Sequence, residues 1–218
     1  MRILLVAATR FEIEGTLKFL ASAPPAGVEI EVLITGPGIV ATTRALTRLL
    51  CTGLEPVDLA INAGIAGSFD PDLLKGTVVQ VSTDVFADFG AEDGEEFIPA
   101  TLMGLSDPEK FPSRNGILIG SHSLDNLLPY ACVKGITVNT VSGNDDTIRR
   151  RRALFGGQTE SMEGAAFFYC CLTEGIDCLQ LRSVSNPVEK RNKANWNLPL
   201  AVNNLNNALI ELINRLNG

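Results

Sequence analysis

Residues 160–166 read ESMEGAA, and residues 182–186 read RSVSN. The first stretch places the carboxylate of Glu163 at the start of an apolar run, residues 165–172, which predicts a buried helix. Its small residues let backbone and side chains approach a ligand closely. The second stretch ends an apolar segment that predicts a buried strand with Asn186 at its carboxyl end. Ligands of open α/β sheets bind at that end of the strands, so the two stretches together indicate a ligand site.

Strand and helix patterns alternate along most of the chain. Short apolar runs predict further buried strands at residues 2–8, 28–34, 57–63, 77–82, 116–120 and 136–141. Apolar residues at three-and-four spacing predict helices over residues 13–20, 40–50 and 198–216. This alternation predicts an α/β fold, a single three-layer domain over residues 1–218 with a mixed, largely parallel sheet flanked by helices.

Composition excludes several function classes. The chain has 218 residues, of which 45% are hydrophobic, and a formal net charge of −7, which argues against a nucleic-acid surface. No apolar run approaches the roughly 20 residues that cross a bilayer, and acidic residues stand where a signal peptide would be cleaved. We therefore expect a cytoplasmic protein with no membrane partner. The four arginines at residues 149–152 predict a solvated helix face, with an anion or partner contact as the alternative.

The cysteines and the single histidine give little support to a metal or a cofactor. Four of the five cysteines have apolar sequence surroundings, and their spacing is unlike that of metal ligands, so we expect buried thiols and no disulfides. The cysteines are Cys51, Cys132, Cys170, Cys171 and Cys178. His122 follows a predicted strand, and a structural role for it outweighs a catalytic one. The sequence predicts neither a metal nor a cofactor.

Four polar segments carry the chemistry, and each has a plainer alternative. Glu12 follows the first strand, where it projects into a cleft or serves as a first-turn acid favoured by the helix dipole. The loop NAGIAGSF at residues 62–69 offers backbone amides to a ribose or a water, or forms a tight turn. Glu163 binds a ligand or begins a helix. Asn186 reads a base edge or caps a turn, since Asn-Pro initiates turns.

The order of these segments resembles that of the nucleoside phosphorylase and nucleosidase superfamily over nearly the whole chain. The shared features are an acid after the first strand (Glu12), a Gly-x-Gly turn (residues 36–38), NAGIAG (62–67), VSG (141–143), ME (162–163) and RxxSN (182–186).

That resemblance implies a role for each residue. Glu12 corresponds to the acid that activates water, Met162 and Glu163 to the binders of the ribose hydroxyls, and Asn186 to the residue that reads the purine. Gly143 and Asn144 fall in the segment along the base. The rest of the implied substrate-binding set comprises Gly64, Ile65 and Ser185.

Two departures from the superfamily pattern refine the reaction. Phosphorylases resemble this chain but carry a phosphate-binding Arg two residues before the loop glycine, where this chain has Asn62; water is therefore the better nucleophile. Adenine-specific nucleosidases look similar but carry Asp where this chain has Asn186. An Asn NH₂ donates to acceptors, so it suits the ring nitrogen and the 6-oxo group of hypoxanthine. The base is predicted to be a 6-oxopurine.

A narrower resemblance agrees with that chemistry. NAGIAGSFD, residues 84–97, SMEGAA and residues 182–196 look like the futalosine hydrolases of the alternative menaquinone route, whose substrate carries hypoxanthine. That resemblance implies hydrolysis of the N-glycosidic bond, with release of hypoxanthine and dehypoxanthine futalosine.

The benzoate on the 5′ tail of futalosine calls for aromatic walls and a cation. We expect Trp196 to form a wall, with Pro37 and Phe89 as lesser choices. Arg10, Arg191 and Lys193 are the choices for the cation.

Two alternatives and an assembly complete the predictions. A methylthioadenosine/adenosylhomocysteine nucleosidase, or another purine nucleoside hydrolase, would share the ribose chemistry. A storage-type protein on the same fold would need no turnover, but Glu12, Glu163 and Asn186 argue against it. The superfamily resemblance implies a homodimer or higher homo-oligomer, in which a neighbouring subunit helps to close the 5′ pocket.

Overall fold

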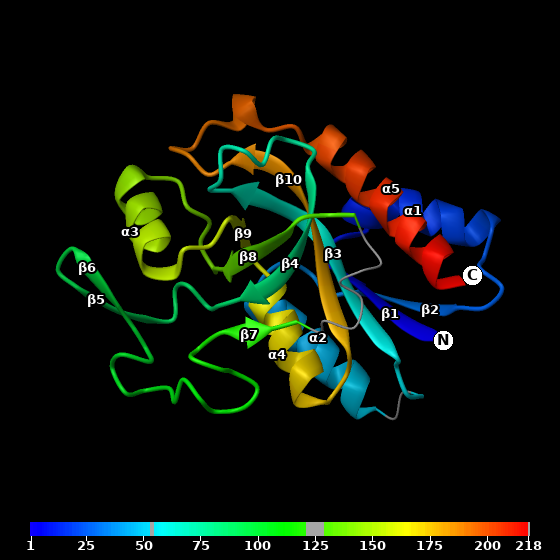
Figure 1. Cartoon of the computed structure of the whole chain (residues 1–218), viewed down its shortest axis with the longest axis horizontal. Helices are drawn as coiled ribbons and strands as arrows, with labels where there is room; N and C mark the ends of the chain where they lie inside the picture. The colour runs from blue at the N-terminus through cyan, green and yellow to red at the C-terminus, as the bar shows by residue number, and fades with distance from the viewer. Residues whose placement is uncertain (53–54, 121–128, 218) are drawn as a thin grey trace.

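One strand is the branch point of the sheet. The computed structural model describes residues 1–52, 55–120 and 129–217. Strand β3 (Leu59–Ser68) pairs along one edge with β10 (Cys178–Pro187), in parallel. Its other edge is shared between β1 (Arg2–Ala7), which pairs with residues 59–62, and β9 (Thr159–Ser161), which pairs with Gly67 and Ser68. Residues 63–66 pair with neither of these two strands, so the edge opens there (Figure 1).

The sheet closes on itself beside this opening. Pairings run from β10 through β4, β8 and β9 back to β3, so five strands form a ring, and β1 and β2 extend the sheet beyond it. The remaining strands are β2 (Glu29–Ile34), β4 (Val78–Asp84), β5 (Gly90–Asp93), β6 (Glu96–Pro99), β7 (Leu118–Ile119) and β8 (Cys132–Thr137). The helices are α1 (Arg10–Ser22), α2 (Ile39–Cys51), α3 (Asp145–Phe155), α4 (Gly164–Thr173) and α5 (Leu198–Asn217), with a 3₁₀ turn η1 (Lys193–Asn195).

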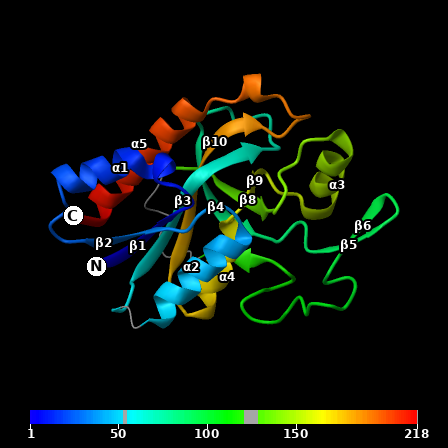
Figure 2. The ribbon, with the colours of Figure 1, turned by 180° about the vertical axis from the view of Figure 1, so that it is seen from behind.

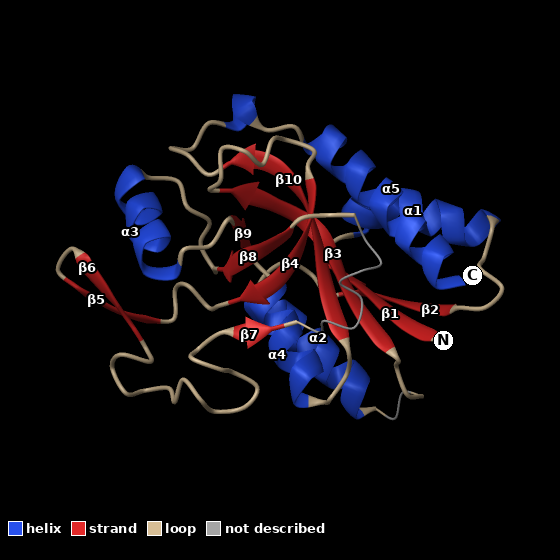
Figure 3. Cartoon of the chain, in the orientation of Figure 1, coloured by secondary structure: helices blue, strands red, loops and turns tan. Residues whose placement is uncertain are grey.

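Helices cover both faces of the sheet. Because side chains alternate along a strand, β1 sends Ile3 and Leu5 to one face and Leu4 and Val6 to the other. The first face packs against α1 and α5, and the second against α2 and α4, which lie side by side when the molecule is seen from behind (Figure 2). The hairpin β5–β6 and helix α3 lie beyond the ring (Figure 3).

The predicted fold class is confirmed, whereas one loop prediction and one strand prediction are wrong. Residues 62–69 were expected to form a loop, yet β3 continues to Ser68, because β10 pairs with this glycine- and alanine-rich stretch along its whole length. The strand expected at residues 136–141 is instead β8, Cys132–Thr137, whose chain position is set by pairing with β4 and β9.

The arginine run and the cysteines also depart from expectation. Arg149 is exposed as predicted, but Arg151 is buried and forms an ion pair with Glu160 at 3.0 Å. Two of the cysteines are exposed: Cys51 is the last residue of α2, and Cys132 is the first residue of β8. The other three are buried: Cys170, Cys171 and Cys178. His122 lies outside the described residues. Among the described helices, none is long and apolar enough to cross a membrane.

Candidate active site

Glu12 faces the opening in the edge of β3. It lies in the first turn of α1, is buried, and accepts hydrogen bonds through Oε2 from the Thr9 backbone N–H at 3.0 Å and the Thr9 hydroxyl at 2.9 Å. Its Oε1 accepts the backbone N–H of Ile65 at 3.2 Å. Three donors therefore fix a carboxylate at the carboxyl half of β3, where α1 begins.

A buried arginine lies beside this carboxylate. Arg182 of β10 is 1% exposed, and its Nη1 stands 2.2 Å from the point where a Cβ of Gly64 would be. Oε1 of Glu12 stands 3.0 Å from that same point. A Cβ at position 64 would require the end of the Arg182 side chain to move, so Gly64 makes room for a carboxylate and a guanidinium to converge.

The sequence analysis missed Arg182, although it lies in the quoted stretch RSVSN. A charged residue inside an apolar strand is the signal that could have found it, since arginine is almost never fully buried without partners. Its Nη2 donates to Oδ1 of Asn62 and to Oε1 of Gln180, the latter at 3.3 Å. The stretch 62–69 contains no basic residue of its own, but β10 brings the guanidinium of Arg182 beside it.

Glu163 is held where two helices begin. It is the N-cap of α4 and is buried, and its Oε1 accepts the backbone N–H of Gly38 at 2.9 Å. Gly38 is the N-cap of α2, where its φ of 92° favours glycine. Met162 is half-buried beside Glu163. The Gly-x-Gly turn and the Met-Glu pair, which are far apart in the sequence, thus meet in the structure.

The amide of Asn186 has one orientation. Its Oδ1 accepts the Ser185 hydroxyl at 2.7 Å, and its Nδ2 donates to the carbonyl of Pro187 at 2.9 Å. A carbonyl only accepts, so the NH₂ must face Pro187, and the second N–H of that group is left for a ligand. In the strand pairing Asn186 lies opposite Gly67, two residues beyond the contact between Ile65 and Glu12.

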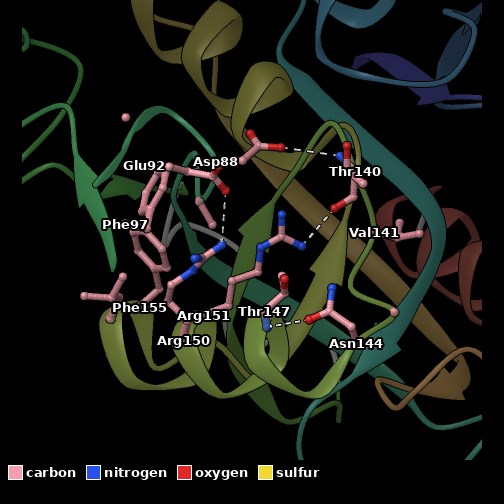
Figure 4. A pocket seen from close by; sticks show the side chains of 14 residues that line it. Asp88, Glu92, Phe97, Thr140, Val141, Asn144, Thr147, Arg150, Arg151 and Phe155 are labelled. Carbon is pink, nitrogen blue, oxygen red and sulfur yellow. Dashed lines mark hydrogen bonds and ion pairs between the residues drawn. The ribbon is translucent and has the colours of Figure 1, made fainter. Parts of the chain in front are cut away.

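The predicted base segment borders a cavity of about 390 Å³ beside α3 (Figure 4). Gly143 and Asn144 line it, and the side chain of Asn144 caps α3 by accepting the backbone N–H of Thr147 at 2.9 Å. Arg150 crosses the opposite wall toward Glu92, at 3.6 Å (Figure 4).

A buried ion pair fixes the base segment from below. Glu160 accepts the backbone N–H of Ser142 at 2.8 Å and its hydroxyl at 2.6 Å. Arg151 completes the pair and also donates to the carbonyl of Thr140 at 2.8 Å. Among the described residues, no cluster of three or more His, Cys, Asp or Glu side chains could hold a metal.

The residues predicted for the 5′ tail divide into two groups. The guanidinium of Arg191 lies 5.6 Å from the ring centre of Trp196. The backbone N–H of Arg191 donates to the backbone carbonyl of Gly143 at 3.2 Å. The structure therefore joins an aromatic side chain, a cation and the base segment. Of the remaining choices, Lys193 in η1 contacts this group through its backbone, whose carbonyl accepts the Trp196 backbone N–H at 3.2 Å. For the side chains of the others no described contact with this group is found: Arg10 begins α1, Pro37 precedes α2 and Phe89 precedes β5.

Known proteins are similar to this chain over nearly its whole length. The family model of the phosphorylase superfamily matches residues 9–214. Futalosine hydrolase of Thermus thermophilus is 30% identical over an alignment of 217 positions, which covers 96% of this chain and 94% of that protein. The chain belongs to the futalosine hydrolase family of the phosphorylase superfamily. The family predicted from the sequence motifs is thereby confirmed.

Two further relatives extend this family assignment. Futalosine hydrolase of Streptomyces coelicolor is 30% identical over 158 residues, 72% of this chain, and the chain spans 66% of that protein's length. A 5′-methylthioadenosine/S-adenosylhomocysteine nucleosidase of Colwellia psychrerythraea, solved in complex with adenine, superposes with a TM-score of 0.80 at 20% identity, over 99% of this chain and 96% of that one. At that identity the second likeness establishes a shared fold.

Proposed function

We propose that this protein hydrolyses the N-glycosidic bond of futalosine and releases hypoxanthine and dehypoxanthine futalosine, a step of the futalosine route to menaquinone. The observation that carries the proposal is the orientation of Asn186, whose amide nitrogen donates to the Pro187 carbonyl and keeps a second N–H for a further acceptor. Hypoxanthine presents acceptors, the imidazole nitrogen and the 6-oxo group, to such a donor. Relatives named as hydrolases favour this enzyme over a storage-type protein.

Water is the nucleophile. A phosphate bound at Arg182 would stand against the buried carboxylate of Glu12, since both groups converge on Gly64. Two like charges about 4 Å apart repel by about 4 kcal/mol at an effective dielectric constant near 20. A neutral water meets no such penalty: it donates to Glu12 and accepts from the guanidinium.

The reaction divides the work between two carboxylates. Glu163 accepts hydrogen bonds from the ribose hydroxyls and orients the sugar, while positive charge develops at the anomeric carbon in an oxocarbenium-like transition state. Glu12 takes a proton from the attacking water. Asn186 donates to the departing hypoxanthine, whose negative charge it stabilises. Because an amide carries no acidic proton, the base takes its proton from solvent.

The 5′ tail is assigned to the pair of Trp196 and Arg191. An indole face offers apolar area to the benzoate ring, and the guanidinium offers paired donors to its carboxylate. The pair lies in the segment that follows β10, so it adjoins Asn186. Of the three cations predicted from the sequence, Arg10, Arg191 and Lys193, we therefore choose Arg191.

We also propose that two copies of this chain associate and that the enzyme works in the cytoplasm. Between β6 and β7, large apolar side chains are exposed, Leu102 by 77% and Leu105 by 71%, with Phe111 beyond them at 69%. A cluster of this kind marks an interaction surface. Buried thiols at Cys170, Cys171 and Cys178 suit a reducing compartment.

Incubation of the protein with four nucleosides tests the function. Futalosine, aminofutalosine, inosine and methylthioadenosine are each supplied with and without phosphate, and the free bases are separated by chromatography. We expect hypoxanthine from futalosine, no acceleration by phosphate, and no ribose 1-phosphate derivative. Release of adenine from methylthioadenosine alone would reassign the protein to the adenine nucleosidases, and a phosphorylated sugar would make it a phosphorylase.

A further inference from the structure

A line of buried polar side chains leads away from Arg182 into the ring of strands. Gln180 lies two residues earlier on β10, is 0% exposed, and accepts the Nη2 of Arg182 through its Oε1 at 3.3 Å. Its Nε2 donates to Oδ2 of Asp84 at 3.2 Å. Asp84 ends β4 and is 1% exposed. An amide thus bridges a buried carboxylate and a buried guanidinium.

The far end of this line is tied to the helix that carries Glu163. Oδ1 of Asp84 accepts the Thr137 hydroxyl at 2.9 Å and the backbone N–H of Val85 at 2.8 Å. The Thr137 oxygen in turn accepts the backbone N–H of Ala165, in the first turn of α4, at 2.7 Å. Asp84 therefore links the start of α4 to the strand that carries Arg182.

Donors and acceptors alternate in one direction along this line. The carboxylate of Asp84 only accepts, so it requires the NH₂ of Gln180 on its side, and this leaves the Gln180 oxygen for the guanidinium. Arg182 only donates, so the reverse orientation would place a donor against a donor. The charge on Asp84 therefore decides which way Gln180 points.

Two glycines, Gly164 and Gly135, leave room for the side chains of Asp84 and Gln180. A Cβ at Gly164 would stand 2.1 Å from Oδ2 of Asp84 and 2.4 Å from Oε1 of Gln180. A Cβ at Gly135 would stand 3.0 Å from the same oxygen of Asp84. Burying a carboxylate without an adjacent cation is costly, and apolar side chains would fill this interior more favourably. The polar line therefore calls for a role beyond packing.

We propose that Gln180 and Asp84 are positioning residues of the hydrolytic site, which hold the guanidinium of Arg182 over Gly64 and beside Glu12. The inference rests on the proposed function, because Arg182 is placed where the attacking water is activated. Burial raises the pKa of Asp84 to about 6, against the opposing effects of the Thr137 and Gln180 hydrogen bonds and the charge of Arg182. At neutral pH the carboxylate is ionised, as the orientation of Gln180 requires.

The test replaces Gln180 by Met, which keeps the length of the side chain and removes both hydrogen bonds. We expect kcat on futalosine to fall by about 10- to 100-fold, the range for one hydrogen bond to a charged group, with KM within about threefold. The inhibition constant of hypoxanthine should not change, because the base is bound elsewhere. The matched control is Ser183→Ala, on the same strand, equally buried, and with no hydrogen bond from its hydroxyl; its kcat should stay at the wild-type value.

Two more variants separate positioning from stability. Asp84→Asn places an NH₂ opposite that of Gln180, so the amide must turn over and lose Arg182; kcat should fall as in Gln180→Met. Gln180→Glu still accepts from Arg182 and shares one proton with Asp84, so activity should lie within about fivefold of wild type near pH 6 and fall as the pH rises and that proton is lost. Arg182 is the charged group that faces this pair.

The outcomes are distinct. Wild-type protein that cleaves none of the four nucleosides overturns the proposed function and this inference with it. Active wild-type protein with unchanged kcat in Gln180→Met overturns the inference alone. If Gln180→Met is not obtained folded, unchanged kcat in Asp84→Asn has the same meaning, and so does a Gln180→Glu variant with a wild-type pH profile.

Discussion

At the scale of single residues, the proposed function depends on one atom of Asn186, the amide nitrogen that we assign to reading a 6-oxopurine. The contact of Nδ2 with the Pro187 carbonyl requires a donor at that position. An ionised Asp there would set an oxygen against the carbonyl oxygen, so the protonated acid would be favoured. The proton of such an acid is engaged by the Pro187 carbonyl, and its remaining lone pairs can accept from a 6-amino group, which hypoxanthine lacks.

Asn186→Asp should therefore shift activity toward adenine nucleosides. One misplaced buried polar contact costs about 1–3 kcal/mol, which corresponds to about five- to a hundredfold in selectivity. The measurement is kcat/KM on futalosine and aminofutalosine for both proteins. An unchanged ratio would mean that Asn186 does not read the base.

Glu12 makes a separate prediction, because its oxygens accept from Thr9 and Ile65 whether or not it acts as a base. Glu12→Gln keeps the shape of the side chain and removes its proton affinity, although its NH₂ must then face one of these donors, and turnover should fall by about 10²- to 10⁴-fold. Substrate binding should stay within about tenfold of wild type. Wild-type turnover in this variant would remove Glu12 from the mechanism.

At the scale of elements, β3 explains both what the sequence predicts and what it hides. The helices α4 and α5 follow from the spacing of their apolar residues, and the end of β10 follows from an apolar run. The stretch NAGIAGS has a loop-like composition, yet it is a strand because β10 pairs with it, and such long-range pairing leaves no local mark. For the same reason the contacts of Arg182 with Asn62 and Gly64 could not be predicted, although all three residues lie in motifs that the sequence analysis singled out.

The opening in β3 predicts a large effect for the smallest substitution. Gly64→Ala would place a methyl group 2.2 Å from Nη1 of Arg182, and overpacking of this kind costs about 1–3 kcal/mol. For a chain of this size each kcal/mol lowers the melting temperature by about 2–4 °C. Displacement of the guanidinium and of Glu12 should also reduce kcat by about 100-fold.

Gly143→Ala is the matched control for that experiment. The nearest atom to its Cβ position, Cβ of Arg191, is 3.7 Å away, so the melting temperature should stay near that of the wild type. Equal loss of stability in the two variants would contradict the close approach of Arg182 to β3.

At the scale of the whole molecule, the apolar segment between β6 and β7 predicts an assembly. Leu102→Ser combined with Leu105→Ser removes two of its most exposed apolar side chains and touches none of the residues placed in the active site. We expect wild-type protein to sediment as a dimer and the double variant to dissociate at micromolar concentration. A monomeric wild-type protein would remove this surface from the description of the enzyme.

The free energy of unfolding of the protein should depend on pH through the titration of Asp84. This group keeps its proton up to about pH 6 in the folded chain and has an ordinary pKa of 3.8. Between these values the folded state binds more protons than the unfolded state, so its stability increases as the pH falls through this window and decreases as the pH rises through it. The difference corresponds to about 3 kcal/mol over the two pH units.

Asp84→Asn lacks this titration, whatever constant offset the substitution adds. The free energy of unfolding of wild type minus that of the variant should therefore increase by about 2 kcal/mol between pH 7.5 and pH 4, most of the full difference, measured by urea denaturation at several pH values. A difference that stays constant with pH would show that burial does not raise the pKa of Asp84 in the folded protein. An increase would mean that the ionised carboxylate makes the folded enzyme less stable at neutral pH. The enzyme would then carry this cost because the charge on Asp84 orients Gln180 and, through it, Arg182.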